Sequence, residues 1–162
     1  MLVAGCASSR KSIVVTDINA IPVGEKLVFG QIKIGDKIPG STTFRDRFII
    51  LYSEDSSLVW KHRLRKDGYF FWHLPSGKYM MIQFSEFIPA AGMVTYSGIG
   101  VEFSVPSDAT TVYIGTLWLF SKQGPWIRIE DQYSAALEVL NHDFPQYKEL
   151  VSKNLMRPEE YR

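Results

Sequence analysis

The chain has 162 residues, of which 46% are hydrophobic and 22% are charged. These values are typical of globular proteins, and a chain of this length buries enough surface to fold without disulfides or metals. The net charge of +1 argues against a protein that binds nucleic acid by general electrostatic attraction. The sequence has no run of 18 apolar residues, so it predicts no membrane-spanning helix.

The first eleven residues predict a lipid-anchored terminus followed by a polar tether. The motif Val3-Ala4-Gly5-Cys6 resembles a bacterial lipobox, in which the cysteine is lipidated and becomes the first residue of the mature protein. Cys6 is the only cysteine, so it cannot form an internal disulfide, and the alternative is a stray thiol in a frayed terminus. A full signal also has a basic segment and an apolar stretch of about 7–15 residues before the cleavage site. We therefore expect further residues upstream of Met1.

The lipobox resemblance implies a partner and a location. The partner would be a membrane, bound through the lipid on Cys6, in a bacterial cell envelope. Ala7 follows the cysteine in place of the aspartate that resembles an inner-membrane retention signal. The expected location is therefore the outer membrane, with the protein facing the periplasm.

After the tether, the sequence predicts short strands separated by Gly, Pro and Asp turn residues. The predicted strands cover residues 12–16, 26–34, 47–53, 57–64, 69–74, 78–85, 100–105, 111–120 and 126–130. Aromatic residues make up 14% of the chain, and they favour strands. Short connections and few helical stretches predict a mainly antiparallel β-sandwich of seven to nine strands over residues 12–131.

Two of these strands, over residues 57–64 and 69–74, predict a hairpin whose register decides what the histidines meet. A two-residue turn at 67–68 pairs His62 with His73, which could hold a metal. A three-residue loop with a left-handed Gly68 pairs His62 with Trp72 instead. We prefer the second register because it gathers apolar residues on one buried face. Those residues are Leu58, Trp60, Leu64, Phe70, Trp72 and Leu74.

Residues 66–79 carry a family resemblance. A turn at Asp67-Gly68, an aromatic strand, the turn Leu74-Pro75-Ser76-Gly77 and then Tyr79 resemble the hallmark of carboxypeptidase regulatory-like, or transthyretin-like, β-sandwich domains. Residues 28–32 resemble the opening strand of that family, so the likeness covers about residues 26–87. The usual Thr-Gly-x-Pro turn is absent. The resemblance implies a fold and no particular function, although related sandwiches are grouped as carbohydrate-binding-like.

The last thirty residues change to helical spacing. The pattern predicts two short helices, over residues 133–141 and 145–156, which form an appendage (132–162) packed on the sandwich. The strand over residues 78–85 has apolar side chains on both faces, and these helices are the expected cover for its second face. Phe71 is expected in the core or beneath the helices.

No catalytic motif is present: the sequence has no P-loop, no G-x-S-x-G and no H-E-x-x-H. Two histidines without a third ligand do not indicate a metal site, so we predict no metal. Because no catalytic motif is present, we also predict no cofactor and no enzymatic activity. The prediction is a non-catalytic envelope lipoprotein, an interaction or structural module with an envelope protein or glycan as partner. The alternative is a carbohydrate-binding module that uses exposed aromatic residues. Its candidate ligand-binding residues are Tyr69, Phe71 and Trp126, flanked by Lys61, Arg63 and His73.

Overall fold

The computed structural model describes Ile13 and the segments 21–35, 47–88, 92–120, 127–147 and 151–159; side chains are described in all of these except residues 86–88 and 93–97. Cys6, Trp126 and all of the predicted strand 12–16 except Ile13 lie outside the described residues. No helix formed by the described residues has the length and apolar character needed to cross a membrane.

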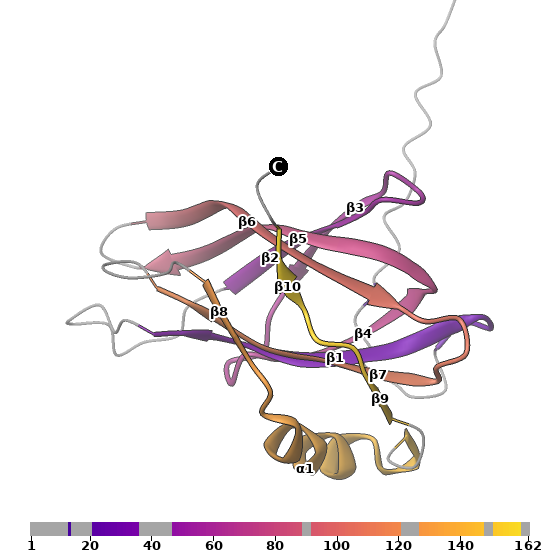
Figure 1. The fold of residues 1–162 in the computed structure, drawn as a ribbon. Coiled ribbons are helices and arrows are strands. Elements are labelled where there is room, and N and C mark those ends of the chain that lie inside the picture. Colours follow the sequence, from indigo (N-terminus) through magenta and orange to yellow (C-terminus); the bar gives the residue numbers. More distant parts are fainter. Residues whose placement is uncertain are drawn as a thin grey trace, which may run out of the picture.

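Two β-sheets face each other, and one helix lies below the lower sheet in Figure 1. The strands are β1 (Glu25–Ile34), β2 (Arg47–Ser53), β3 (Val59–Arg63), β4 (Tyr69–Pro75), β5 (Gly77–Ile88), β6 (Gly92–Val105), β7 (Thr111–Leu119), β8 (Ile127–Glu130), β9 (Val151–Lys153) and β10 (Arg157–Pro158). Sheet A has the order β4-β1-β7-β8, with β9 also beside β7. Sheet B has the order β10-β6-β5-β2-β3.

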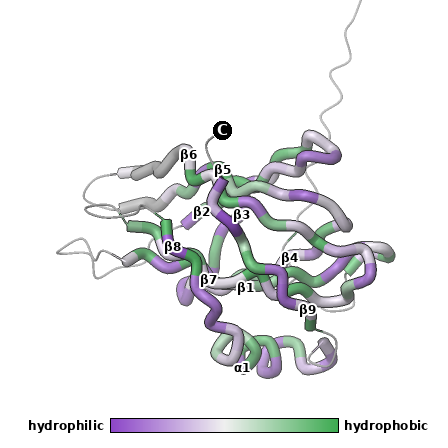
Figure 2. Tube along the Cα trace, in the orientation of Figure 1, coloured by the Kyte–Doolittle hydropathy of each residue, from purple (hydrophilic) through white to green (hydrophobic). Residues whose placement is uncertain are grey.

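This arrangement confirms the predicted fold class, a mainly antiparallel β-sandwich. Two pairings are parallel, β1 with β7 and β7 with β9. Figure 2 shows hydrophobic stretches along the strands of both sheets. The described residues form ten strands, more than the seven to nine expected, because two short strands occur near the C-terminus.

The C-terminal region corrects one prediction. The helix α1 (Tyr133–Asp143) matches the first predicted helix. The second, over residues 145–156, is wrong: a 3-10 turn at Pro145–Tyr147 is followed by β9 and β10. The amides of Asn154 and Met156 donate to the carbonyls of Tyr113 and Ile114 on β7, at 2.9 and 2.8 Å. An isolated short helix is marginal, so pairing with a buried strand prevails over the helical spacing.

The predicted hairpin is also wrong, because its two strands belong to different sheets. β3 pairs with β2 in sheet B, and β4 pairs with β1 in sheet A. The connection between them passes from one layer to the other. At its end Gly68 adopts the predicted positive φ, +78°, where a Cβ would lie 2.1 Å from the carbonyl oxygen of Ile32. A local pattern of apolar residues is the same for a hairpin and for a crossover between facing sheets.

The two histidines nevertheless lie on opposite sides of β4, as the preferred register predicts. His62 packs against the ring of Trp72 across the sandwich, with ring centroids 6.0 Å apart. His73 follows Trp72 in β4 and therefore points to the other face. Most of the predicted buried face is also confirmed: Leu64, Phe70, Trp72 and Leu74 are buried and Trp60 is half-buried. Leu58 is the exception, with 51% of its surface exposed, because it lies before β3 in the turn from β2.

The apolar residues form two clusters on the two sides of sheet A. The larger fills the space between the sheets, and Trp72, Tyr79 and Phe84 are among its fully buried side chains. The smaller lies between the outer face of sheet A and α1. The helix therefore covers sheet A, and the prediction that it covers the second face of the strand 78–85 in sheet B is wrong (Figure 1).

The motif behind the family resemblance forms a tight turn between β4 and β5, and so between the two sheets. The Tyr79 hydroxyl donates to the carbonyl of Pro75 at 2.8 Å. Gly77 has φ +152°, and a Cβ there would lie 2.3 Å from the Asp55 carboxylate, which accepts a bond from the Lys78 amide at 3.0 Å. Burial, with smaller contributions from Asp55 and Glu25, raises the pKa of Tyr79 to about 12. The turn is thus closed by a buried, neutral tyrosine.

Candidate functional site

Phe71, a candidate for sugar stacking, lies in the core. Its side chain is buried between the rings of Phe29 and Phe144, with centroids 6.2 and 4.8 Å away. This confirms the expectation that Phe71 lies beneath the helical region, and it corrects the prediction of an exposed ring. Tyr69, two residues earlier on the same face of β4, is half-buried against the same cluster.

His73 is likewise held inside the fold. Its side chain is buried, and its Nδ1 contacts the carboxylate of Glu25 on the neighbouring strand β1. Its backbone amide donates to the carbonyl of Ile13 at 2.8 Å. His73 therefore joins β1, β4 and the N-terminal segment. Its side chain does not form part of an exposed binding surface.

Lys61 and Arg63 come from β3 of sheet B, and both are exposed. The Lys61 Nζ atom sits 4.6 Å from the centroid of the Phe48 ring. The predicted ligand residues are thus divided between the two sheets, because β3 and β4 do not pair. Cys6 and Trp126 lie outside the described residues.

A small recess brings Arg63, Tyr69 and Phe71 together, where the layers meet near Phe144. Its volume is about 60 Å³. Pockets for small molecules are usually about 300–1,000 Å³. This recess has room for water and not for a sugar ring.

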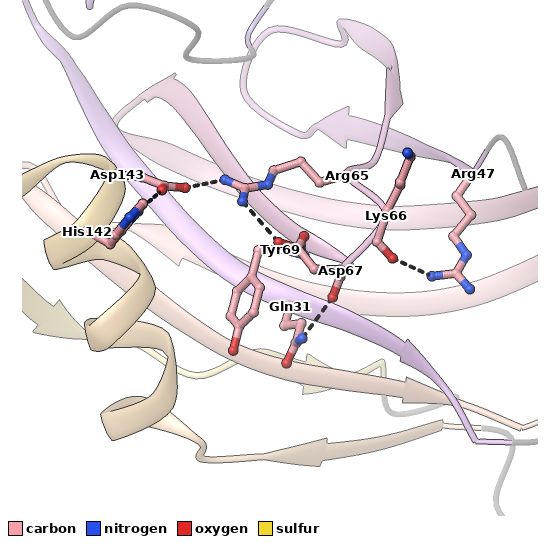
Figure 3. A network of polar contacts seen from close by, with 8 residues as sticks. All are labelled: Gln31, Arg47, Arg65, Lys66, Asp67, Tyr69, His142 and Asp143. Carbon is pink, nitrogen blue, oxygen red and sulfur yellow. Dashed lines mark hydrogen bonds and ion pairs between the residues drawn. The ribbon is translucent and has the colours of Figure 1, made fainter. Parts of the chain in front are cut away.

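Beside the recess, Arg65 links the segment between β3 and β4 to the end of α1 (Figure 3). Its guanidinium bonds to Asp67 at 2.9 Å and to Asp143, which also contacts His142 at 2.7 Å. Burial opposes the charge of Arg65, but the bonds to Asp143 and Asp67 outweigh it and raise its pKa. The bonds from Arg65 and His142 lower the pKa of Asp143. The network holds the helix against the sandwich.

His62 is buried in β3, and this burial shifts its pKa. Burial, with a smaller contribution from the charge of His73, lowers its pKa to about 4. Its Nε2 atom is buried and has no hydrogen-bond partner. Among the described residues, no group of three or more His, Cys, Asp or Glu side chains is placed to hold a metal ion.

A larger cleft lies where the segment between β9 and β10 passes β5 and β6. Its volume is about 490 Å³, within the usual range for ligand pockets. The polar residues that line it are Glu54, Lys78, Glu102, Ser104, Asn154 and Arg157. The Asn154 side chain is fixed by bonds to the Ser104 carbonyl and hydroxyl, at 2.8 and 2.7 Å.

Sequence reasoning missed this cleft. Its residues come from four separate segments, and no motif joins them. Lys78 and Ser104 are cross-strand neighbours in the β5–β6 pair, and Glu102 and Arg157 are neighbours in the β6–β10 pair. Only these strand pairings bring the residues together.

Comparison with family models, curated proteins and solved structures gives no match to this chain. The resemblance of residues 26–87 to carboxypeptidase regulatory-like domains therefore rests on the sequence motif alone.

Proposed function

We propose that this protein is a non-catalytic lipoprotein of the bacterial cell envelope, whose sandwich serves as an interaction or structural module. The observation that carries the proposal is the lipobox-like motif Val3-Ala4-Gly5-Cys6, followed in the sequence by the polar stretch Ala7–Lys11. The proposal includes outer-membrane attachment and a carboxypeptidase regulatory-like fold. It assigns no reaction, because the sequence has none of the catalytic motifs that we sought.

The position of Ile13 supports an anchoring role for the terminus. Ile13 is buried in the main core and accepts a hydrogen bond from the amide of His73 on β4. Seven residues after Cys6, it can lie at most roughly 25 Å from that cysteine along an extended chain. A lipid on Cys6 would therefore keep the β4 edge within that distance of the membrane. Two or more acyl chains give stable anchoring.

The test is mass spectrometry of the protein expressed with its native upstream region, together with membrane fractionation of Cys6→Ser. The membranes are washed at high salt, which removes electrostatically bound protein but leaves acylated protein in place. We expect acylated Cys6 in the washed membrane and Cys6→Ser in the wash or soluble fraction. Ser8→Ala is the matched control and should remain in the washed membrane. An unmodified Cys6, or a Cys6→Ser variant that resists the wash, would contradict the anchor.

A carbohydrate-binding role is the second candidate. The cleft near Asn154 is a better location for such a site than the aromatic residues that the sequence predicted. The cleft has the volume and the polar side chains that a sugar requires, whereas Phe71 is buried. Titration with a panel of polysaccharides, followed by tryptophan fluorescence, tests it. Our leading proposal expects weak binding or none. Saturable binding lost in Glu102→Ala would assign the cleft, and loss in Trp126→Ala would assign the predicted aromatic platform.

A further inference from the structure

Strand β3 and Leu58, the residue directly before it, combine exposed apolar and basic side chains. Leu58 and Val59 are 51% and 41% exposed, and they are two of the three large exposed hydrophobic residues in the described part of the chain. Lys61 and Arg63 follow on the same strand and are also exposed. Four of the chain's 18 basic residues lie between positions 61 and 66, with no acidic residue among them. The rest of the chain is therefore net acidic.

These residues continue across the outer face of sheet B. Val59 lies opposite Tyr52, Lys61 opposite Ile50, and Arg63 opposite Phe48. We call these six residues the basic–aromatic face. Phe48, Ile50 and Tyr52 are half-buried and alternate with Ile49 and Leu51, which point into the core. No element formed by the described residues lies over this face, whereas α1 covers the outer face of sheet A (Figure 1).

Three described acidic side chains in the turns next to β2, β3 and β4 have contacts of their own. Asp55 accepts a bond from the Lys78 amide, and Asp67 pairs with Arg65. Glu54, in the turn after β2, faces the cleft described above. Positive charge and apolar surface thus occur side by side on one strand and its neighbour.

The face borders the edge from which the anchor would leave. β3 and β4 are the terminal strands of their sheets, and the contact between His62 and Trp72 shows that these two edges lie over one another. Ile13 is bonded to β4 at this same edge. The opposite edge carries β9 and β10. A lipid on Cys6 would therefore bring the β3 side of the molecule to the membrane first.

We propose that the basic–aromatic face, together with Leu58, docks on the anionic lipid headgroups of a membrane. The inference rests on the proposed lipid anchor for its choice of partner. Basic residues near a bilayer are attracted to anionic lipids, and aromatic and aliphatic side chains enter the headgroup region. One surface that supplies both fits a lipid bilayer better than it fits a purely polar polyanion.

The test uses the full chain with Cys6→Ser, so that no lipid anchor contributes. Co-sedimentation is measured with vesicles of phosphatidylcholine alone and of phosphatidylcholine with phosphatidylglycerol. We expect binding to the anionic vesicles only, weakened by salt. Lys61→Gln/Arg63→Gln should lower the affinity about 30-fold, from the loss of two basic contacts. Arg128→Gln/Lys153→Gln removes the same charge at the opposite edge, on β8 and β9, and should have little effect. Leu58→Ser should also weaken binding, and circular dichroism checks that each variant is folded.

Three results would overturn the docking face. They are no binding to anionic vesicles, an equal loss in the two double variants, and binding to a soluble acidic polysaccharide as tight as binding to vesicles. The last result would indicate an acidic glycan as the partner. Because the vesicle experiment does not use Cys6, vesicle binding together with an unmodified Cys6 in cells would refute the anchor and leave the docking face standing.

Discussion

The buried histidine His62 makes the stability of the sandwich core depend on pH. It lies in β3, packs on Trp72 of the other sheet, and keeps an unpartnered Nε2 atom in an apolar environment. A charged imidazole there would lose its hydration without gaining a partner, so the neutral form is favoured in the folded protein.

We predict that His62 makes the protein less stable in mild acid. Its pKa is about 4 in the folded state and 6.5 in the unfolded state, so between these values the unfolded chain binds more protons. This contribution is fully present above pH 6.5 and is lost as the pH falls toward 4. The free energy of unfolding should fall by about 2 kcal/mol between pH 7.5 and pH 5. Urea unfolding at the two pH values measures it.

His62→Phe is the control for this prediction. It keeps a ring against Trp72 but cannot take up a proton, so the difference between pH 7.5 and pH 5 should shrink by the same amount. An unchanged pH dependence in His62→Phe would show that other groups cause the loss.

At the scale of an element, α1 is held by a narrow apolar stripe. Ala136 and Leu140 are its buried residues, and Phe144 follows directly after it. They pack on Phe29 and Phe71 of sheet A, while the network around Arg65 holds the end of the helix. This packing explains why β4 carries aromatic residues toward both of its faces: one side meets sheet B, and the other meets the helix.

We predict that Leu140→Ala loosens the helix from the sheet. Leu140 is fully buried, so its truncation should lower the free energy of unfolding by about 3 kcal/mol. Urea unfolding gives the loss, and hydrogen exchange of the α1 amides should rise. Glu138→Ala changes an exposed residue of the same helix and should alter stability by less than about 0.5 kcal/mol. Similar losses in both variants would show that the helix does not depend on this contact.

At the scale of the whole molecule, the C-terminal segment joins the two sheets at one edge. β9 pairs with β7 in sheet A, and β10 pairs with β6 in sheet B. Asn154 lies between them and binds both layers: its amide donates to Tyr113 and its side chain to Ser104. The same residue helps to line the cleft.

We predict that Asn154→Ala weakens this link between the sheets. The change removes two side-chain hydrogen bonds to Ser104, and stability should fall by about 1–2 kcal/mol. Hydrogen exchange should rise at the amide of Glu159, which donates to the Gly100 carbonyl beside β10. Asn141→Ala removes an exposed amide on α1 and should leave both quantities unchanged. If the two variants behaved alike, Asn154 would not link the layers.

The sequence by itself determined the features that depend on neighbours along the chain. Apolar and aromatic stretches bounded by Gly, Pro and Asp turn residues predicted strands at the positions of β2 and β7. Gly68 predicted a positive φ, because side chains are strained in that conformation. The spacing of apolar residues predicted α1, and the aromatic pattern placed Trp72 and His73 on opposite sides of β4.

Only the tertiary structure decided which strands are neighbours and which polar residues meet. The pattern of β3 and β4 suits a hairpin and a crossover between sheets equally well, and the choice depends on their pairing with β2 and β1. The apolar residues after α1 have helical spacing, yet part of this segment pairs with β7 as the strand β9. The cleft brings together side chains from distant segments. These outcomes depend on contacts between residues far apart in sequence, and the local spacing of apolar residues does not predict such contacts.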